Sequence, residues 1–286
     1  LLDNVQFIYE LSLAQWELSS LGADYEITNG LREFRLNNKS NELSERIIKK
    51  TSYFKSVGTN FTDYFQIIRK NRTRSVNQYL SHWIYPYKGK FHPQMIRALL
   101  NIIGLKEGDT VFEPFSGSGT TALEAQLLGI NFMGIDISPV CILQGKVKTG
   151  SLNAIDEIIK CKNDLVSEIK PSLFNREQDF YKVLEEIKNN QVRDFFTLAR
   201  LLAVSDESRR GRSFEQSFIR NLNLMIDSVS DYKEISETLN LKLGHVDLKE
   251  GDSRNIELPD DSVDGIITSP PYSIALDYVE NDAHSL

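Results

Sequence analysis

A glycine-bearing loop between an apolar run and a helical segment constrains this chain more than any other feature. Residues 111–140 read VFEPFSGSGTTALEAQLLGINFMGIDISPV. A short apolar run ends in small residues, a helical segment follows, and a second apolar run ends at Asp136. This order predicts a strand, a tight turn, a helix and a second strand parallel to the first, which is the unit from which α/β sheets are built. We therefore expect an α/β fold around this loop.

The exposed backbone of the loop is suited to bind an anion or a nucleoside. Gly117 and Gly119 let the chain turn sharply and approach a ligand, and the amides that open the next helix point toward it. Asp136 follows at about the spacing at which an acidic residue binds ribose hydroxyls. Thr120 and Thr121 occupy the positions after Gly119, so the dinucleotide-binding glycine pattern is incomplete. The pattern favours a ligand with a ribose but no pyrophosphate, such as S-adenosylmethionine; a purely structural turn with an exposed aspartate is the alternative.

A second short motif follows a predicted strand near the end of the chain. Residues 265–272 read GIITSPPY. Pro270 and Pro271 end the strand, because proline lacks the backbone N–H and restricts the residue before it to extended geometry. The Ser269 hydroxyl, the neighbouring carbonyls and the ring of Tyr272 would then form a receptor for a planar group that carries an NH2. An ordinary turn with a surface tyrosine is the alternative.

Several segments together resemble the DNA amino-methyltransferases, which methylate cytosine N4 or adenine N6. The segments are FEPFSGSGTT, GID, EGDSRNI and TSPPY, together with YPYKGKFHPQMIRALL before the glycine loop. The resemblance covers residues 81–150 and 245–280, and it implies S-adenosylmethionine as the cofactor and DNA as the partner. Ser-Pro-Pro-Tyr is the form associated with N4-cytosine enzymes, and adenine N6 remains the alternative.

The resemblance also implies which residues bind the cofactor. They are Phe91, His92, Glu113, Phe115, Ser116, Gly117, Gly119, Asp136 and Asp252. Glu113 would lie near the methionine amino group, Asp136 would bind the ribose hydroxyls, and Asp252 would bind the adenine amino group. Phe91 and His92 would close over the methionine end. His92 is equally well explained as a packing histidine at the start of a helix.

The catalytic corner implied by the resemblance consists of Ser269, Pro270, Pro271 and Tyr272. Hydrogen bonds from the target NH2 to the Ser269 hydroxyl and the Pro270 carbonyl would localise the nitrogen lone pair, and positioning would supply much of the acceleration. A base in a duplex must first be flipped out, and Tyr272 would recover part of the lost stacking. The two cysteines follow no Pro-Cys motif, which argues against cytosine C5 chemistry, and the sequence suggests no metal cluster.

The chain divides into four predicted parts. They are a helical N-terminal region (1–80), a first methyltransferase segment with the cofactor corner (81–150), a helical insert (151–240) and a second methyltransferase segment with the catalytic corner (241–286). The insert shows apolar residues at helical spacing and no convincing strand. It would read DNA sequence, form a dimerisation arm or serve as a packing insert, and the last is slightly favoured because no base-reading motif stands out.

The resemblance implies a Rossmann-like sheet of seven strands, of which only the first four can be found. They are expected near 110–113, 131–135, 245–249 and 263–268. A sheet that ended at the fourth strand would expose an apolar edge, which invites pairing with another chain. The expectation is therefore a fragment, or half of a split enzyme that a second polypeptide completes.

Composition narrows the setting of the protein. The net charge of −7 argues weakly against a protein that coats nucleic acid. Basic residues concentrate at 67–75, 87–90 and 208–213, as phosphate contacts or as solvated loops. The two cysteines favour a reducing compartment, here the cytoplasm. No apolar run approaches the roughly 18 residues that a membrane span needs.

Two rival functions remain open at this point. An RNA or protein-glutamine methyltransferase would share the cofactor corner, and Ser269 argues mildly against it because those enzymes commonly have Asn or Asp before Pro-Pro-Tyr. A nucleic-acid-binding subunit without catalysis belongs to another class, and would keep the cofactor corner as a scaffold only.

Overall fold

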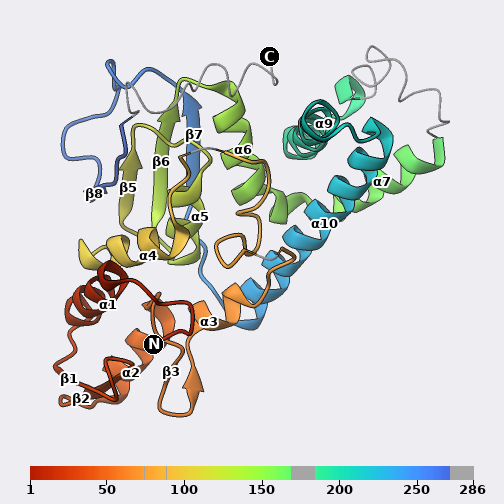
Figure 1. The fold of residues 1–286 in the computed structure, drawn as a ribbon. Helices are drawn as coiled ribbons and strands as arrows, with labels where there is room; N and C mark the ends of the chain where they lie inside the picture. Colours follow the sequence, from red (N-terminus) through yellow and green to blue (C-terminus); the bar gives the residue numbers. More distant parts are fainter. Residues whose placement is uncertain (74, 88, 169–183, 271–286) are drawn as a thin grey trace.

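A parallel sheet lies at the centre of the described structure (Figure 1). The computed structural model describes residues 1–73, 75–87, 89–168 and 184–270, without the side chains of 164–168. The central strands are β5 (Thr110–Glu113), β6 (Asn131–Asp136), β7 (Val246–Glu250) and β8 (Gly265–Ile266). All three pairings are parallel and the order is β7-β6-β5-β8. The predicted α/β class with a parallel sheet is therefore confirmed.

The strands lie where the sequence predicts strands one to four, and β8 is shorter than expected. Val111 of β5 is opposite Phe132 of β6 on one side and Gly265 of β8 on the other. Val111 and Phe132 are fully buried, and Leu248 of β7 lies on the same face. Apolar runs of this kind are typical of parallel strands that helices cover.

Three helices cover that face of the sheet. They are α4 (Pro93–Ile102), α5 (Thr120–Leu127) and α6 (Pro139–Gly150). Ile96 and Leu100 of α4, Ala122 of α5 and Ile142 of α6 share one apolar cluster with the strands. The helix α4 begins with proline and is followed by Gly104 at φ +84°, as predicted from residue preferences at helix ends.

The N-terminal region contains short hairpins as well as the predicted helices. Its elements are α1 (Ile8–Ser20), β1 (Tyr25–Thr28), β2 (Glu33–Leu36), α2 (Asn41–Lys50), β3 (Ser56–Val57), β4 (Asn60–Phe61) and α3 (Asp63–Ile68). The prediction of helices and loops missed both hairpins, because strands of two to four residues carry too little alternation to detect. This region packs on α4, where the buried Glu17 carboxylate accepts hydrogen bonds from Ser52 and Asn101.

Helices fill the described part of the segment between α6 and β7. They are the 3-10 helix η1 (Ser151–Ala154), α7 (Ile155–Glu168), α9 (Asn190–Arg210) and α10 (Phe214–Thr238). Figure 1 shows α10 as a long helix that runs from α9 toward α3, and its buried Tyr232 and Ile235 join the N-terminal core. The boundaries of the four parts stay a prediction. None of the described helices has the length and apolar character that crossing a membrane requires.

Candidate functional site

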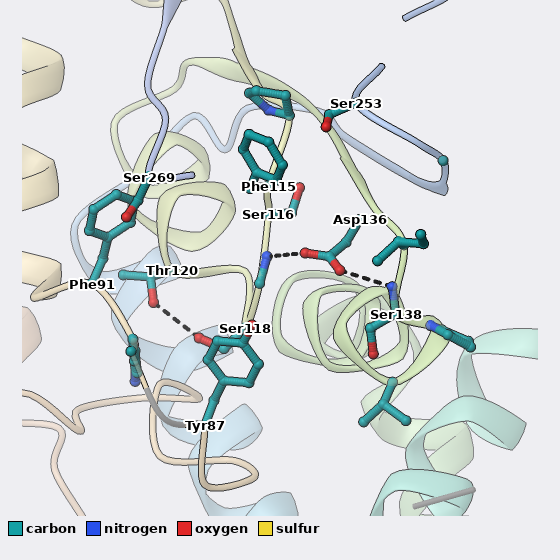
Figure 2. Close-up of a pocket in the computed structure, with 18 of the residues that line it drawn as sticks. Tyr87, Phe91, Phe115, Ser116, Ser118, Thr120, Asp136, Ser138, Ser253 and Ser269 are labelled. Atoms are coloured by element: carbon teal, nitrogen blue, oxygen red, sulfur yellow. Dashed lines mark hydrogen bonds between the residues drawn. The ribbon is translucent and has the colours of Figure 1, made fainter. Parts of the chain in front are cut away.

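A cavity of about 380 Å³ opens at the carboxyl ends of the central strands (Figure 2). Its walls come from the segment before α4, from the loops that follow β5, β6 and β7, and from Ser269 after β8. The chain moves from β5 to β6 and β7 on one side, and β8 lies on the other side of β5. Loops therefore diverge above β5 and leave a crevice, which is where open α/β sheets bind their ligands.

The two glycines of the loop have different geometric reasons to be glycine. Gly117 (φ +49°) and Gly119 (φ +73°) both adopt left-handed backbone geometry, which favours glycine. Gly117 lines the cavity opposite Tyr87. Gly119 does not line it, and a Cβ there would lie 2.8 Å from the Cα of Gly145 in α6. Gly119 thus permits close packing of α5 against α6, while Gly117 shapes the ligand surface.

Asp136 fixes the loop from the end of the neighbouring strand. Its carboxylate accepts hydrogen bonds from the backbone N–H of Gly117 at 2.7 Å and of Ser138 at 2.9 Å, as Figure 2 shows. One side chain therefore joins the glycine loop to the start of α6. A carboxylate has about four lone-pair sites, so these bonds leave capacity for hydroxyl donors from a ligand.

Glu113 is the last residue of β5 and is almost completely buried, with 1% of its surface exposed. Neither carboxyl oxygen has a hydrogen-bond partner among the described residues. Burial raises the pKa of Glu113 to about 8; the nearby Thr121 hydroxyl opposes this rise and the negative charge of Asp136 adds to it. The carboxyl is thus mainly neutral at pH 7. It does not line the cavity, but the three residues after it do.

The segment before α4 forms the opposite wall. Phe91 lines the cavity, and so do Tyr87 and Lys90 of the same segment, which sequence reasoning did not single out as cofactor-binding residues. The Lys90 amine donates to the carbonyl of His82, and burial lowers its pKa to about 8. His92 does not line the cavity and stands at the N-cap of α4. This position agrees with the packing interpretation of His92.

Asp252 and Ser253 follow β7 and line the cavity. The Asp252 carboxylate accepts hydrogen bonds from the backbone N–H of Arg254 at 2.9 Å and from its guanidinium. The guanidinium, together with the backbone bond, lowers the pKa of Asp252 to about 2. Asp252 is therefore an ionised acceptor at the cavity rim, and the Arg254 side chain covers part of its capacity.

Ser269 lines the same cavity as Gly117 and Asp136. Figure 2 labels Ser269 and Asp136 among the side chains around this one opening. The two motifs of the sequence thus meet on one side of the molecule. Pro270 is exposed next to Ser269, while Pro271 and Tyr272 lie outside the described residues.

Sequence reasoning also missed the apolar floor next to the ribose-binding candidate. Ile137 lines the cavity and is 76% exposed, so its apolar surface is available for contact with a planar ring. Pro139 and Val140 continue this surface at the start of α6. The sequence signal that could have identified these residues is their position directly after Asp136, the acidic residue that ends β6.

A buried polar cluster lies behind the glycine loop. The Glu124 carboxylate of α5 accepts a hydrogen bond from the Tyr79 hydroxyl at 2.6 Å and contacts the His82 ring nitrogen at 2.7 Å. Burial lowers the pKa of His82 to about 4. The buried Lys148 amine of α6 donates to the carbonyl of Ser118 at 2.7 Å. The Glu124 contacts connect α5 to the segment that carries Lys90, and the Lys148 contact connects α6 to the glycine loop.

Comparisons with known proteins agree with this geometry. A family model described as DNA methylase matches residues 23–146. The type II methyltransferase M.MjaII of Methanocaldococcus jannaschii is 32% identical over 169 residues, which is 59% of this chain and 29% of that protein. M.BsoBI of Geobacillus stearothermophilus, also a type II methyltransferase, is 48% identical over 64 residues, 22% of this chain and 12% of that protein.

An RNA-modifying protein also matches. The tRNA (guanine(10)-N2)-dimethyltransferase of Methanocaldococcus jannaschii is 34% identical over 100 residues, which is 35% of this chain and 26% of that protein. In each of these three comparisons the match spans less than a third of the relative. The residues that the family model matches contain the glycine loop and Asp136, and the family model and both type II methyltransferases support a relation of this chain to the DNA methylases that modify N4 or N6 amino groups.

Proposed function

We propose that this chain carries the cofactor and target-base site of a DNA methyltransferase, which transfers a methyl group from S-adenosylmethionine to the exocyclic amino group of a flipped base. The observation that carries the proposal is that Ser269 shares one cavity with Gly117 and Asp136. The strand order β7-β6-β5-β8 supports a Rossmann-like sheet, because it matches the order 3-2-1-4 of that fold.

The residues of the cavity fit S-adenosylmethionine chemically. Asp136 offers a carboxylate for ribose hydroxyls, and Ile137 offers an apolar surface for the adenine ring. Gly117 keeps the loop open to a ligand, and the orphaned carboxyl of Glu113 matches the positive amino-acid end. A volume of about 380 Å³ lies within the range of small-molecule sites. Phe91 and Tyr87 would cover the cofactor and exclude water.

The bound cofactor would supply an electrophilic methyl group, and the chain would position the nucleophile. The Ser269 hydroxyl and the Pro270 carbonyl would accept hydrogen bonds from the target NH2, which localises the lone pair of its nitrogen. Tyr272 would stack on the flipped base and recover about 1–3 kcal/mol of lost stacking. Because the target NH2 would be held facing the cofactor cavity, its attack on the methyl group would become effectively unimolecular.

Cytosine N4 is the target we favour, because Ser269 precedes the two prolines, and adenine N6 is the alternative. The matched tRNA enzyme supports a second candidate, an exocyclic amine of an RNA base. All of these reactions use the same chemistry at an aromatic NH2. Incubation of the full chain with methyl-labelled S-adenosylmethionine and either duplex DNA or tRNA, followed by nucleoside analysis, separates them.

The expected product of this experiment is N4-methylcytosine in DNA. Label in N6-methyladenine would correct the base, and label in tRNA alone would move the function to RNA. Binding of cofactor and DNA without transfer by the intact chain would support the subunit without catalysis. Tyr272→Ala should reduce transfer by orders of magnitude and leave cofactor affinity near normal.

We also propose that a second polypeptide adds to the sheet at β8, as part of a restriction or epigenetic system. Among the described residues β8 pairs only with β5, and its Ile266 is 60% exposed. An apolar strand edge of this kind favours association. Light scattering should show self-association of the purified chain and less of it in Ile266→Lys. A wild-type chain that is monodisperse at high concentration would contradict the proposal.

A further inference from the structure

Lys148 is a buried lysine that the proposed mechanism does not use. It lies in the last turn of α6 and is 1% exposed, and no carboxylate of the described residues is among the groups that act on its amine. An ionised amine loses its hydration on burial, and a neutral one has given up a proton that it would hold in water at neutral pH. Either form destabilises the folded protein. A reason other than stability is therefore needed for a lysine at this position.

The amine of Lys148 contacts the glycine loop. It donates a hydrogen bond to the backbone carbonyl of Ser118 at 2.7 Å, and this contact is buried. The N–H of the same peptide group belongs to Gly119 and donates to the carbonyl of Ser116 at 2.9 Å. Both ends of this peptide group are therefore held, the N–H by the loop itself and the carbonyl by α6.

Without Lys148 the peptide group between Ser118 and Gly119 would lose the partner of its carbonyl. Rotation of this group changes ψ of Ser118 and φ of Gly119, and glycine accepts either sign of φ. Ser118 lines the cavity, so a rotated group would turn its carbonyl away from α6 and toward water in the cavity. The surface that the loop presents to a ligand would then change.

We propose that Lys148 is a positioning residue that holds the glycine loop in the form that binds the cofactor. This inference rests on the proposed function. Two consecutive turns of α6 contact the loop, because Gly145 lies against Gly119 and Lys148 fixes the carbonyl of Ser118. Lys148 does not itself line the cavity, so it acts on a ligand through the loop. Its removal should lower cofactor affinity and spare the chemical step at saturating cofactor, since bound cofactor would restore the loop.

Lys148→Met tests the proposal, and Gln144→Met is the matched control. Gln144 lies one turn earlier on α6 and is fully buried, and neither polar atom of its side chain has a hydrogen-bond partner among the described residues. Methionine is similar in length to both side chains and needs no hydrogen bond. Each substitution removes a polar group whose burial is costly. Urea unfolding should therefore show that neither variant is less stable than the wild type.

Cofactor affinity should separate the two variants. In equilibrium dialysis of the full chain, Lys148→Met should bind S-adenosylmethionine at least about tenfold more weakly than the wild type, and Gln144→Met should bind it equally well. In methyl transfer to DNA, the KM for the cofactor should rise by a similar factor in Lys148→Met, while kcat stays within about threefold. Hydrogen exchange of the amides of residues 116–121 should be faster in Lys148→Met alone.

The outcomes against the proposal are distinct. Equal affinity of Lys148→Met and the wild type, or an equal loss in both variants, would overturn this inference alone. A Lys148→Met chain that fails to fold or is less stable than the wild type would assign Lys148 to fold stability and overturn the inference. A lower kcat with an unchanged KM would do the same. Absence of S-adenosylmethionine binding by the wild-type chain would overturn the proposed function as well.

Discussion

Asp136 is the residue on which the geometry of the glycine loop depends. Both of its oxygens accept backbone N–H bonds, one from Gly117 and one from Ser138. Bonds to a charged acceptor typically contribute about 1.5–3 kcal/mol. The same carboxylate lines the cavity, so loop geometry and ligand binding depend on one side chain.

Replacement of Asp136 by Asn should weaken cofactor binding by roughly ten- to a hundredfold, the equivalent of about 1.5–3 kcal/mol. An amide has only one oxygen, so one of the two backbone N–H groups would face an NH2 group. Asp264→Asn is the matched control, because Asp264 accepts the N–H of Thr110 at 2.7 Å at the opposite ends of the strands. Dissociation constants of both variants check the prediction. An equal loss of affinity in the two would contradict it.

Glu113 predicts how the stability of the ligand-free protein depends on pH. Its pKa rises from 4.5 to about 8 on folding, so the folded state retains the proton in this window while the unfolded state loses it. Stability should therefore fall as the pH rises from about 4.5 to 8, by up to about 1.4 kcal/mol per pH unit. Glu113→Gln removes this contribution. Urea unfolding of the wild-type chain and of Glu113→Gln at pH 5, 6, 7 and 8 measures this contribution. A difference in unfolding free energy between the two proteins that stays constant with pH would contradict the prediction.

At the scale of elements, the close approach of α5 and α6 places the loop over the sheet. The loop ends at Gly119, the N-cap of α5, whose position against Gly145 leaves no room for a side chain. The dense contact explains why a helix with weak apolar periodicity is nevertheless buried along its whole length. Packing on both sides, and not amphipathic character, stabilises α5.

Gly119→Ala should therefore cost clearly more stability than the left-handed geometry alone requires. Gly211 offers a matched control, since it ends α9 at φ +61° and a Cβ there would meet nothing within 4 Å. Gly211→Ala should cost about 1–2 kcal/mol, the usual penalty of a left-handed alanine. Gly119→Ala should cost at least twice as much and also weaken cofactor binding. Chemical denaturation measures the unfolding free energy of both variants. An equal loss of stability in Gly119→Ala and Gly211→Ala would contradict the prediction.

At the scale of the whole molecule, α10 connects the helical segment to the N-terminal region. The Asp231 carboxylate of α10 accepts two hydrogen bonds from the Arg72 guanidinium, at 2.5 and 2.9 Å. Lys70 pairs with Glu234 on the same helix at 2.8 Å. The basic stretch around residue 70 therefore serves a tertiary contact. In the basic stretch 208–213, Arg210 and Arg212 likewise pair with Asp206 of α9.

Arg72→Ala should lower stability by about 1 kcal/mol and leave DNA affinity nearly unchanged after correction for the folded fraction. The reason is that the guanidinium pairs with Asp231, which is mostly buried. Arg69→Ala is the matched control, because Arg69 lies over the Phe65 ring in the same stretch and has no ion pair among the residues that the structure describes. Thermal unfolding and DNA titration at two salt concentrations check this. Loss of DNA affinity without loss of stability in Arg72→Ala would identify the stretch as a phosphate contact.

The glycine loop, the strands and Asp136 could be predicted because each depends on local backbone rules. Left-handed geometry at Gly117, proline at the start of α4 and an acidic strand end are all visible in short segments of sequence. The short hairpins of the N-terminal region were not visible, because strands of two to four residues form only where partners meet. Ile137 was missed for a related reason, since an isoleucine does not mark a cavity by itself.

By itself the sequence determined the strand, loop, helix and strand around Asp136, because turn geometry and apolar periodicity act over a few residues. Only the tertiary structure decided that Ser269 meets this loop in one cavity, since parallel strands bring distant carboxyl ends to a common edge. It also decided the charge of Glu113. Burial beside Asp136, which no short segment encodes, raises the pKa of that carboxyl to about 8.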